Sequence, residues 1–126
     1  MSIISKIVLK RLLEFKVFRS GPGRMNLKSR APENIYNQLE PYDEYLKRAI
    51  FLLDGIDEVE LNYNTGTILI LYDIEKTGET RILKWVNKIT DIGMENQETI
   101  EAYANRDIGE LEILLERQLM EEVKNL

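Results

Sequence analysis

Cysteine and histidine are both absent from this chain of 126 residues. Without cysteine the protein can form neither disulfides nor thiolate metal sites, and thiol catalysis is excluded as well. Without histidine it lacks the commonest general base and the commonest transition-metal ligand. Most acid–base, nucleophilic and soft-metal sites therefore cannot be assembled. We expect a protein that is not an enzyme and that carries no cofactor.

Charge is distributed unevenly along a composition that is otherwise globular, with 44% hydrophobic and 31% charged residues. Residues 1–30 carry eight basic side chains and one acidic one, whereas 31–126 hold nine basic and twenty-one acidic residues. Such asymmetry predicts a basic arm that meets an anionic surface. Nucleic acid is not the expected partner, because the body is acidic and the predicted sheet lacks the aromatic residues that stack on bases.

The segment 1–14 is predicted to be a short, basic amphipathic helix, because its apolar residues recur at helical spacing. Lys10 and Arg11 interrupt the apolar run, so the pattern fits neither a secretory signal nor a membrane span. A helix of this kind lies on a membrane surface, docks on a partner or packs on its own domain. The candidate contact residues are its basic side chains, Lys6, Lys10 and Arg11. We expect a cytoplasmic protein, peripheral at the inner face of the membrane.

The remaining elements follow from hydrophobic periodicity and turn residues. Residues 15–30 are predicted to be extended, with a bend or bulge at Gly21-Pro22-Gly23. Next come a loop over 31–41, a helix over 42–53, a hairpin of 59–63 and 67–72, a helix over 78–92 and a helix over 108–124. Thr77 and Gly93 are the predicted ends of the helix over 78–92. Residues 94–107 are ambiguous, because 98–102 fits a short strand and a helix equally well.

This order of elements predicts an α+β protein with a ferredoxin-like β-α-β-β-α-β sandwich over residues 15–105. The terminal helices, 1–14 and 106–126, either cover the open face of its sheet or pair two subunits. The last helix carries an apolar stripe that is the candidate partner face, represented by Leu111, Leu115 and Leu119. A homo-oligomer, such as a dimer, is therefore expected.

Three short segments resemble the divergent heavy-metal-associated-like domains that lack a cysteine pair. They are Pro-Gly-Arg followed by Met-Asn-Leu at 22–27, Leu-Asp-Gly-Ile-Asp-Glu-Val at 53–59, and the hairpin from Asn62 to Asp73. The resemblance covers about 15–93. It implies a ferredoxin-like fold and a role beside metal-transporting P-type ATPases. Metal-binding members hold Cu(I) or Zn(II) with two thiolates in the loop after the first strand, but here the matching stretch, 29–43, has neither cysteine nor histidine.

The expected function is therefore that of a non-catalytic interaction module without a thiolate metal site. It acts beside a metal-transporting P-type ATPase or another membrane protein, or at an anionic membrane surface. Arg24 is a further candidate contact for an anionic group, although it can equally anchor the bend at 21–23.

The alternative is a protein that handles or stores Fe(II) or a similar divalent metal through carboxylates, since oxygen ligands suit hard cations. The candidate acidic clusters lie at four places, with the members Glu40, Asp43 and Glu44; Asp54, Asp57 and Glu58; Glu98 and Glu101; and Glu112 and Glu116.

Overall fold

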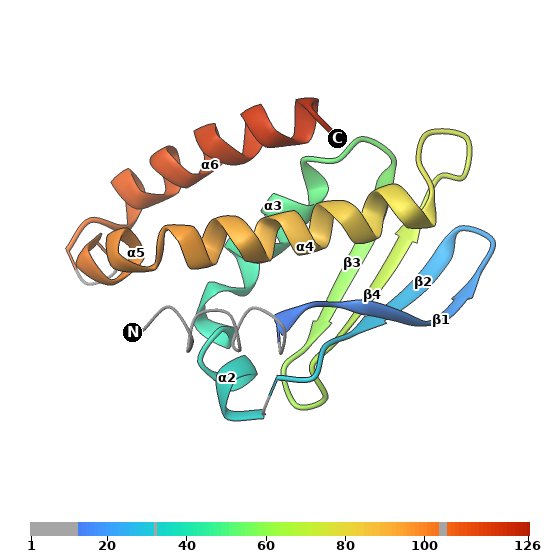
Figure 1. Cartoon of the computed structure of the whole chain (residues 1–126), viewed down its shortest axis with the longest axis horizontal. Helices are drawn as coiled ribbons and strands as arrows, with labels where there is room; N and C mark the ends of the chain where they lie inside the picture. Colours follow the sequence, from blue (N-terminus) through green and yellow to red (C-terminus); the bar gives the residue numbers. More distant parts are fainter. Residues whose placement is uncertain (1–12, 32, 104–105) are drawn as a thin grey trace.

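A computed structural model describes residues 13–31, 33–103 and 106–126 of the protein. Four antiparallel strands form one sheet in the order β1-β2-β4-β3 (Figure 1). The strands are β1 (Lys16–Gly21), β2 (Arg24–Lys28), β3 (Ile56–Asn62) and β4 (Thr67–Tyr72). Helices α3, α4 and α6 lie on one side of this sheet. The α+β class and the ferredoxin-like sandwich with additional helices are confirmed.

The extended segment over 15–30 is a β-hairpin rather than one bent strand. Its turn passes through Gly23, whose φ of 69° lies in the left-handed region that favours glycine. β1 pairs with β2 and forms the edge of the sheet. In the expected β-α-β-β-α-β topology, the strand that follows the second helix would occupy this edge instead. The possible strand over 98–102 is accordingly absent. Those residues belong to α5 (Gln97–Tyr103), so the helical alternative is confirmed.

A split β-α-β unit forms the middle of the molecule. β2 and β3 run in the same direction on either side of β4, and α3 (Asp43–Phe51) connects them. The predicted loop before α3 contains a short helix, α2 (Glu33–Asn37), and a 3-10 turn, η1 (Glu40–Tyr42). The turn between β3 and β4 needs a glycine at Gly66, whose φ is 69°.

Both predicted ends of the second long helix are wrong. α4 (Glu79–Glu95) begins after Gly78, and the Thr77 hydroxyl is buried without a hydrogen-bond partner among the described residues. The helix also continues through Gly93, whose φ is not positive. It ends at Glu95, and the side-chain amide of the capping residue Asn96 donates a hydrogen bond of 2.8 Å to the Ile92 carbonyl oxygen. Glycine ends a helix where it adopts the left-handed conformation just after the last helical residue, and Gly93 does not adopt it.

The core lies between the inner face of the sheet and the helices α3 and α4. Its buried members are Met25, Leu27, Ile50, Leu53, Ile68, Ile70, Ile82, Trp85 and Val86. Trp85 is fully buried, and its indole N–H donates to the Ala49 carbonyl oxygen at 3.0 Å. A buried indole needs such a partner, and this one also fixes α4 against α3.

The last helix, α6 (Ile108–Lys124), packs on α3 and α4 and does not cover the open face of the sheet (Figure 1). Leu111 is buried, and Leu119, Val123 and Leu126 pack against the core. The expectation that this helix covers the open face is therefore wrong, because the helical layer supplies the apolar surface that its stripe needs. Within the described ranges, no helix combines the length and apolar character of a membrane span.

Candidate functional site

The loop after β2, where the metal-binding relatives of the resembled family carry thiolates, is closed here by structural contacts. The buried Ser29 hydroxyl is hydrogen-bonded to the Tyr36 hydroxyl and accepts a long hydrogen bond of 3.4 Å from the Ala31 N–H. The Tyr36 ring packs so closely on Gly66 that a side chain at that position would collide with it. Burial raises the pKa of Tyr36, which keeps its hydroxyl neutral. Through Tyr36, this loop therefore packs α2 against the β3–β4 turn.

Asp43, one of the candidate metal ligands, is committed to another pair of contacts. Its carboxylate accepts a hydrogen bond of 2.7 Å from the Tyr63 hydroxyl and forms an ion pair of 3.1 Å with Lys47. The hydrogen bond from Tyr63 lowers the pKa of Asp43, while burial and the neighbouring carboxylate raise the pKa of Tyr63. The pair joins the start of α3 to the end of β3, which is a structural role.

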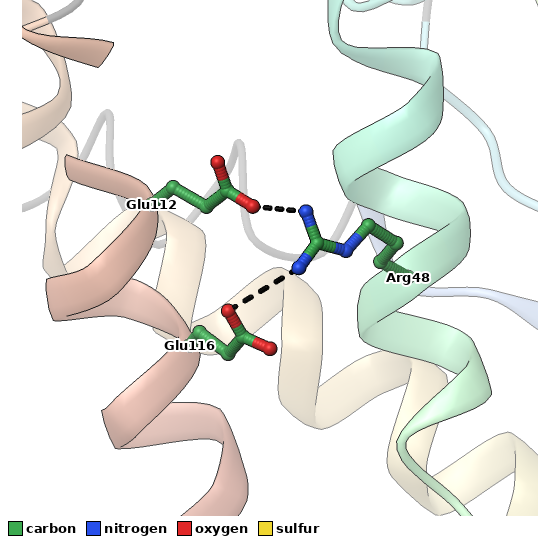
Figure 2. A network of polar contacts seen from close by, with 3 residues as sticks. All are labelled: Arg48, Glu112 and Glu116. Carbon is green, nitrogen blue, oxygen red and sulfur yellow. Dashed lines mark hydrogen bonds and ion pairs between the residues drawn. The ribbon is translucent and has the colours of Figure 1, made fainter. Parts of the chain in front are cut away.

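The acidic pair on α6 is occupied as well (Figure 2). The guanidinium of Arg48 reaches from α3 to the carboxylates of Glu112 and Glu116, the second at 3.5 Å. Across the residues that the structure describes, no three acidic side chains converge in a way that would hold a metal ion. The geometry therefore does not favour the carboxylate-based metal site.

An apolar cavity of about 460 Å³ lies among α3, α4 and α6. Leu46, Ile89 and Leu115 are in its wall, which also includes Leu13 and Phe15, at the beginning of the described chain. The titratable side chains in this wall with displaced pKa values are tyrosines held neutral, Tyr36 and Tyr63. The wall is mainly apolar and also includes the ion-paired side chains of Arg48, Glu112 and Glu116.

The opposite face of the sheet, which we call the outer face, is built by alternation along the strands, which bulges interrupt between Val17 and Arg19 in β1 and between Ile56 and Glu58 in β3. Met25 and Leu27 point into the core, so their neighbours in β2 point outward. The strand register, which accounts for the two bulges, then pairs these outward positions of β2 with positions in the other strands and places eight large side chains on the outer face. They are Lys16, Arg19, Arg24, Lys28, Glu58, Glu60, Leu69 and Leu71.

The outer face is divided into a basic half and an acidic half. The four basic residues all lie on β1 and β2, while both acidic residues lie on the other edge strand, β3. The two leucines of β4 separate the halves and are partly exposed. In the described part of the chain, no ion pair involves any of these six charged side chains. Lys16 even stands directly opposite Lys28 across the β1–β2 ladder, an unfavourable arrangement for two like charges.

The structure places the candidate contact residues in three different settings. Arg24 is exposed on the outer face opposite Gly21 and Leu71, while Lys6, Lys10 and Arg11 lie outside the described residues. The stripe represented by Leu111, Leu115 and Leu119 faces the chain's own cavity and core. Contact of that stripe with a second chain stays a prediction.

Of the eight outer-face residues, sequence reasoning identified Arg24 as a candidate contact and Glu58 as a member of a candidate acidic metal cluster. The other charged members of β2 and β3 carried a usable signal, since polar residues alternate with apolar ones in Arg24–Lys28 and from Glu58 to Asn62. What the sequence did not supply was the strand order that assembles them into two halves.

Comparison with known proteins decides the family. The family model described as heavy metal associated domain 2 matches residues 9–126. The chain belongs to this family. The resemblance seen over 15–93 is thereby confirmed, and the match extends through α6. No curated protein matches the chain, and no solved structure matches it. Membership of the heavy metal associated domain 2 family supports a metal-related accessory role.

Proposed function

We propose that this heavy metal associated domain is a non-catalytic interaction module that works beside a metal-transporting P-type ATPase or at an anionic membrane surface. The observation that carries the proposal is the closed loop after β2. Ser29 and Tyr36 occupy it with a buried hydrogen bond in place of thiolate ligands. A member of this family without metal ligands in that loop acts through its surfaces and not by carrying the ion.

The pattern of displaced pKa values supports the non-catalytic part of the proposal. The described groups with a resolved shift are Asp43, Tyr36 and Tyr63, and all three are engaged in hydrogen bonds that join elements of the fold. Each shift favours the ordinary protonation state at neutral pH. Active sites instead often carry a group whose pKa is moved toward the working pH.

Membrane contact is assigned to the basic residues that precede the sheet, Lys6, Lys10 and Arg11. Each lysine or arginine near an anionic bilayer contributes about 1 kcal/mol to binding. The test is flotation with phosphatidylglycerol-containing vesicles and with pure phosphatidylcholine vesicles. The wild type should float with the anionic vesicles, and a variant with these three residues changed to Glu should not.

The matched control changes three exposed basic residues of the helical side, Arg81, Lys84 and Arg117, to Glu. It has the same net charge as the test variant and should float like the wild type. Loss of flotation in both variants would show attraction by net charge alone, which contradicts the assignment. Flotation of neither the wild type nor the variants would reject membrane contact and leave the transporter as the partner.

The proposal also excludes tight binding of a divalent metal by the chain itself. Calorimetric titration with Zn(II), Mn(II) or, without oxygen, Fe(II) should give no saturable heat. A stoichiometric transition at micromolar metal would overturn the proposal in favour of carboxylate-based metal handling.

A further inference from the structure

The outer face of the sheet carries two opposite charges in separate halves and no described element covers it. Helices α3, α4 and α6 all lie on the other side (Figure 1). A surface whose basic half and acidic half lie side by side is complementary to a copy of itself. An anionic membrane or an acidic partner would instead be repelled by Glu58 and Glu60, which are both exposed on β3.

We propose that two copies of this chain associate through their outer faces, with β1 and β2 of one copy lying over β3 and β4 of the other. Each basic half then faces the partner's acidic half, and the paired leucines of β4, Leu69 and Leu71, lie near the centre. This dimer is independent of whether the transporter or the membrane is the partner in the cell.

The charge arrangement also selects the symmetry axis. A two-fold axis that runs parallel to the strands, between β2 and β4, exchanges the two edges of the sheet and brings basic residues over acidic ones. An axis across the strands would place β1 over its own copy, so that Arg19 would face Arg19. Through the strand register, the favoured axis brings Arg19 of one copy over Glu60 of the other, because both lie in the same cross-strand row.

The dimensions of the face set the expected affinity. Four strands about 4.8 Å apart and about six residues long give a surface of roughly 19 by 20 Å. Two such surfaces bury roughly 760 Å² in total, which is the size of a weak or transient interface. We therefore expect a dissociation constant of about 1 to 50 μM, weakened by salt because the charged pairs lie at the rim.

Charge reversal tests the face. Changing Glu58→Lys together with Glu60→Lys makes the whole face basic, and changing Arg19→Glu together with Arg24→Glu makes most of it acidic. Sedimentation velocity over a concentration series should show a dimer for the wild type. Each double variant alone should dimerise about 10- to 100-fold more weakly, because both Arg19–Glu60 pairs across the interface become repulsive. An equimolar mixture of the two variants should regain the dimer.

The matched control is Glu95→Lys with Glu121→Lys, two exposed acidic residues near the ends of helices. It changes the net charge equally and should dimerise like the wild type. Circular dichroism and urea unfolding establish that every variant is folded. A wild type that stays monomeric at 500 μM overturns the proposal, as does a dimer that both reversals leave intact. A mixture that fails to regain the dimer also contradicts it.

The axis is tested by crosslinking, for which the absence of native cysteine is useful. Single variants Arg19→Cys and Glu60→Cys are mixed and treated with a short thiol-to-thiol crosslinker, and the products are identified by mass. The strand-parallel axis predicts a 19–60 product from the mixture and little product from either variant alone. Strong 19–19 and 60–60 products would overturn this axis.

Discussion

Leu111 and Leu114 provide a direct test of whether α6 belongs to the core of the domain or waits for a partner. Leu111 is 3% exposed and lines the cavity beside α3 and α4, whereas Leu114 is 42% exposed on the same helix. Both residues are leucines within α6, so Leu111→Ala and Leu114→Ala have the same effect on helix propensity. Any difference between the two variants therefore reports tertiary packing.

The expected loss for Leu111→Ala follows from its burial. Leucine-to-alanine changes in cores cost about 2 to 5 kcal/mol, and a site at the edge of an existing cavity belongs near the lower end. We expect about 2 to 3 kcal/mol for Leu111→Ala and less than about 1 kcal/mol for Leu114→Ala. In a domain of this size the first change lowers the melting temperature by about 6 to 12 °C.

Urea unfolding followed by circular dichroism measures both free energies of unfolding, at 5 μM and again at 100 μM protein. Equal losses for the two variants would refute the reasoning that α6 is packed through Leu111. A loss for Leu111→Ala that appears only at the higher protein concentration would show instead that this leucine contacts a second chain, as its place in the apolar stripe first suggested.

Three further changes test the polar contacts and the tight turn. Tyr63→Phe removes the donor to Asp43 and should cost about 1 kcal/mol at neutral pH by urea unfolding. Folding lowers the pKa of Asp43, so this contribution to stability is present above the pKa of Asp43 in the unfolded chain and is lost as the pH falls through its pKa in the folded protein. The difference in free energy of unfolding between wild type and variant should therefore shrink below about pH 4. A difference that stays constant with pH would contradict the link between Tyr63 and the ionisation of Asp43. Gly66→Ala should cost more than about 1 kcal/mol of stability, because φ at this position is positive and the Tyr36 ring fills the space that a side chain would need. Gly21→Ala should cost less than about 0.5 kcal/mol in the same assay, because φ there is ordinary and the space around it is open. Arg48→Met should cost less than about 1 kcal/mol, although Arg48 forms two ion pairs, because its side chain is 57% exposed. A loss above about 2 kcal/mol would show that solvent screens these ion pairs less than the exposure of Arg48 implies.

The elements that the sequence predicted well are those with a strong local pattern. The stripe that includes Leu46, Ile50 and Leu53 predicted α3, and the turn ending in Gly66 predicted the β3–β4 hairpin. Residues 98–102 stayed ambiguous because a five-residue pattern fits both periods. Local spacing could not show that β1 takes the edge position beside β2, since that depends on which strands pair.

The candidate site was less accessible to sequence reasoning for the same reason. The missing cysteines predicted that the loop after β2 has no thiolate ligand, but only the fold shows Ser29 bonded to Tyr36 there. Likewise, i,i+4 spacing identified Glu112 and Glu116 as a pair, yet their partner, Arg48, lies 64 and 68 positions away along the chain. Side chains this far apart in sequence leave no periodic signal.

Because β1 completes the sheet from the N-terminal side, all four strands lie within residues 16–72. During synthesis the residues of all four strands are therefore made before those of α4, α5 and α6. At typical translation rates the roughly 50 residues that follow β4, through α6, take about 3 to 10 s to be made. Over that interval the inner-face residues that Trp85 later covers, such as Met25 and Ile70, have only α3 to shield them. The nascent domain is then most exposed to aggregation on the ribosome, at the stage when the binding of a chaperone would protect it.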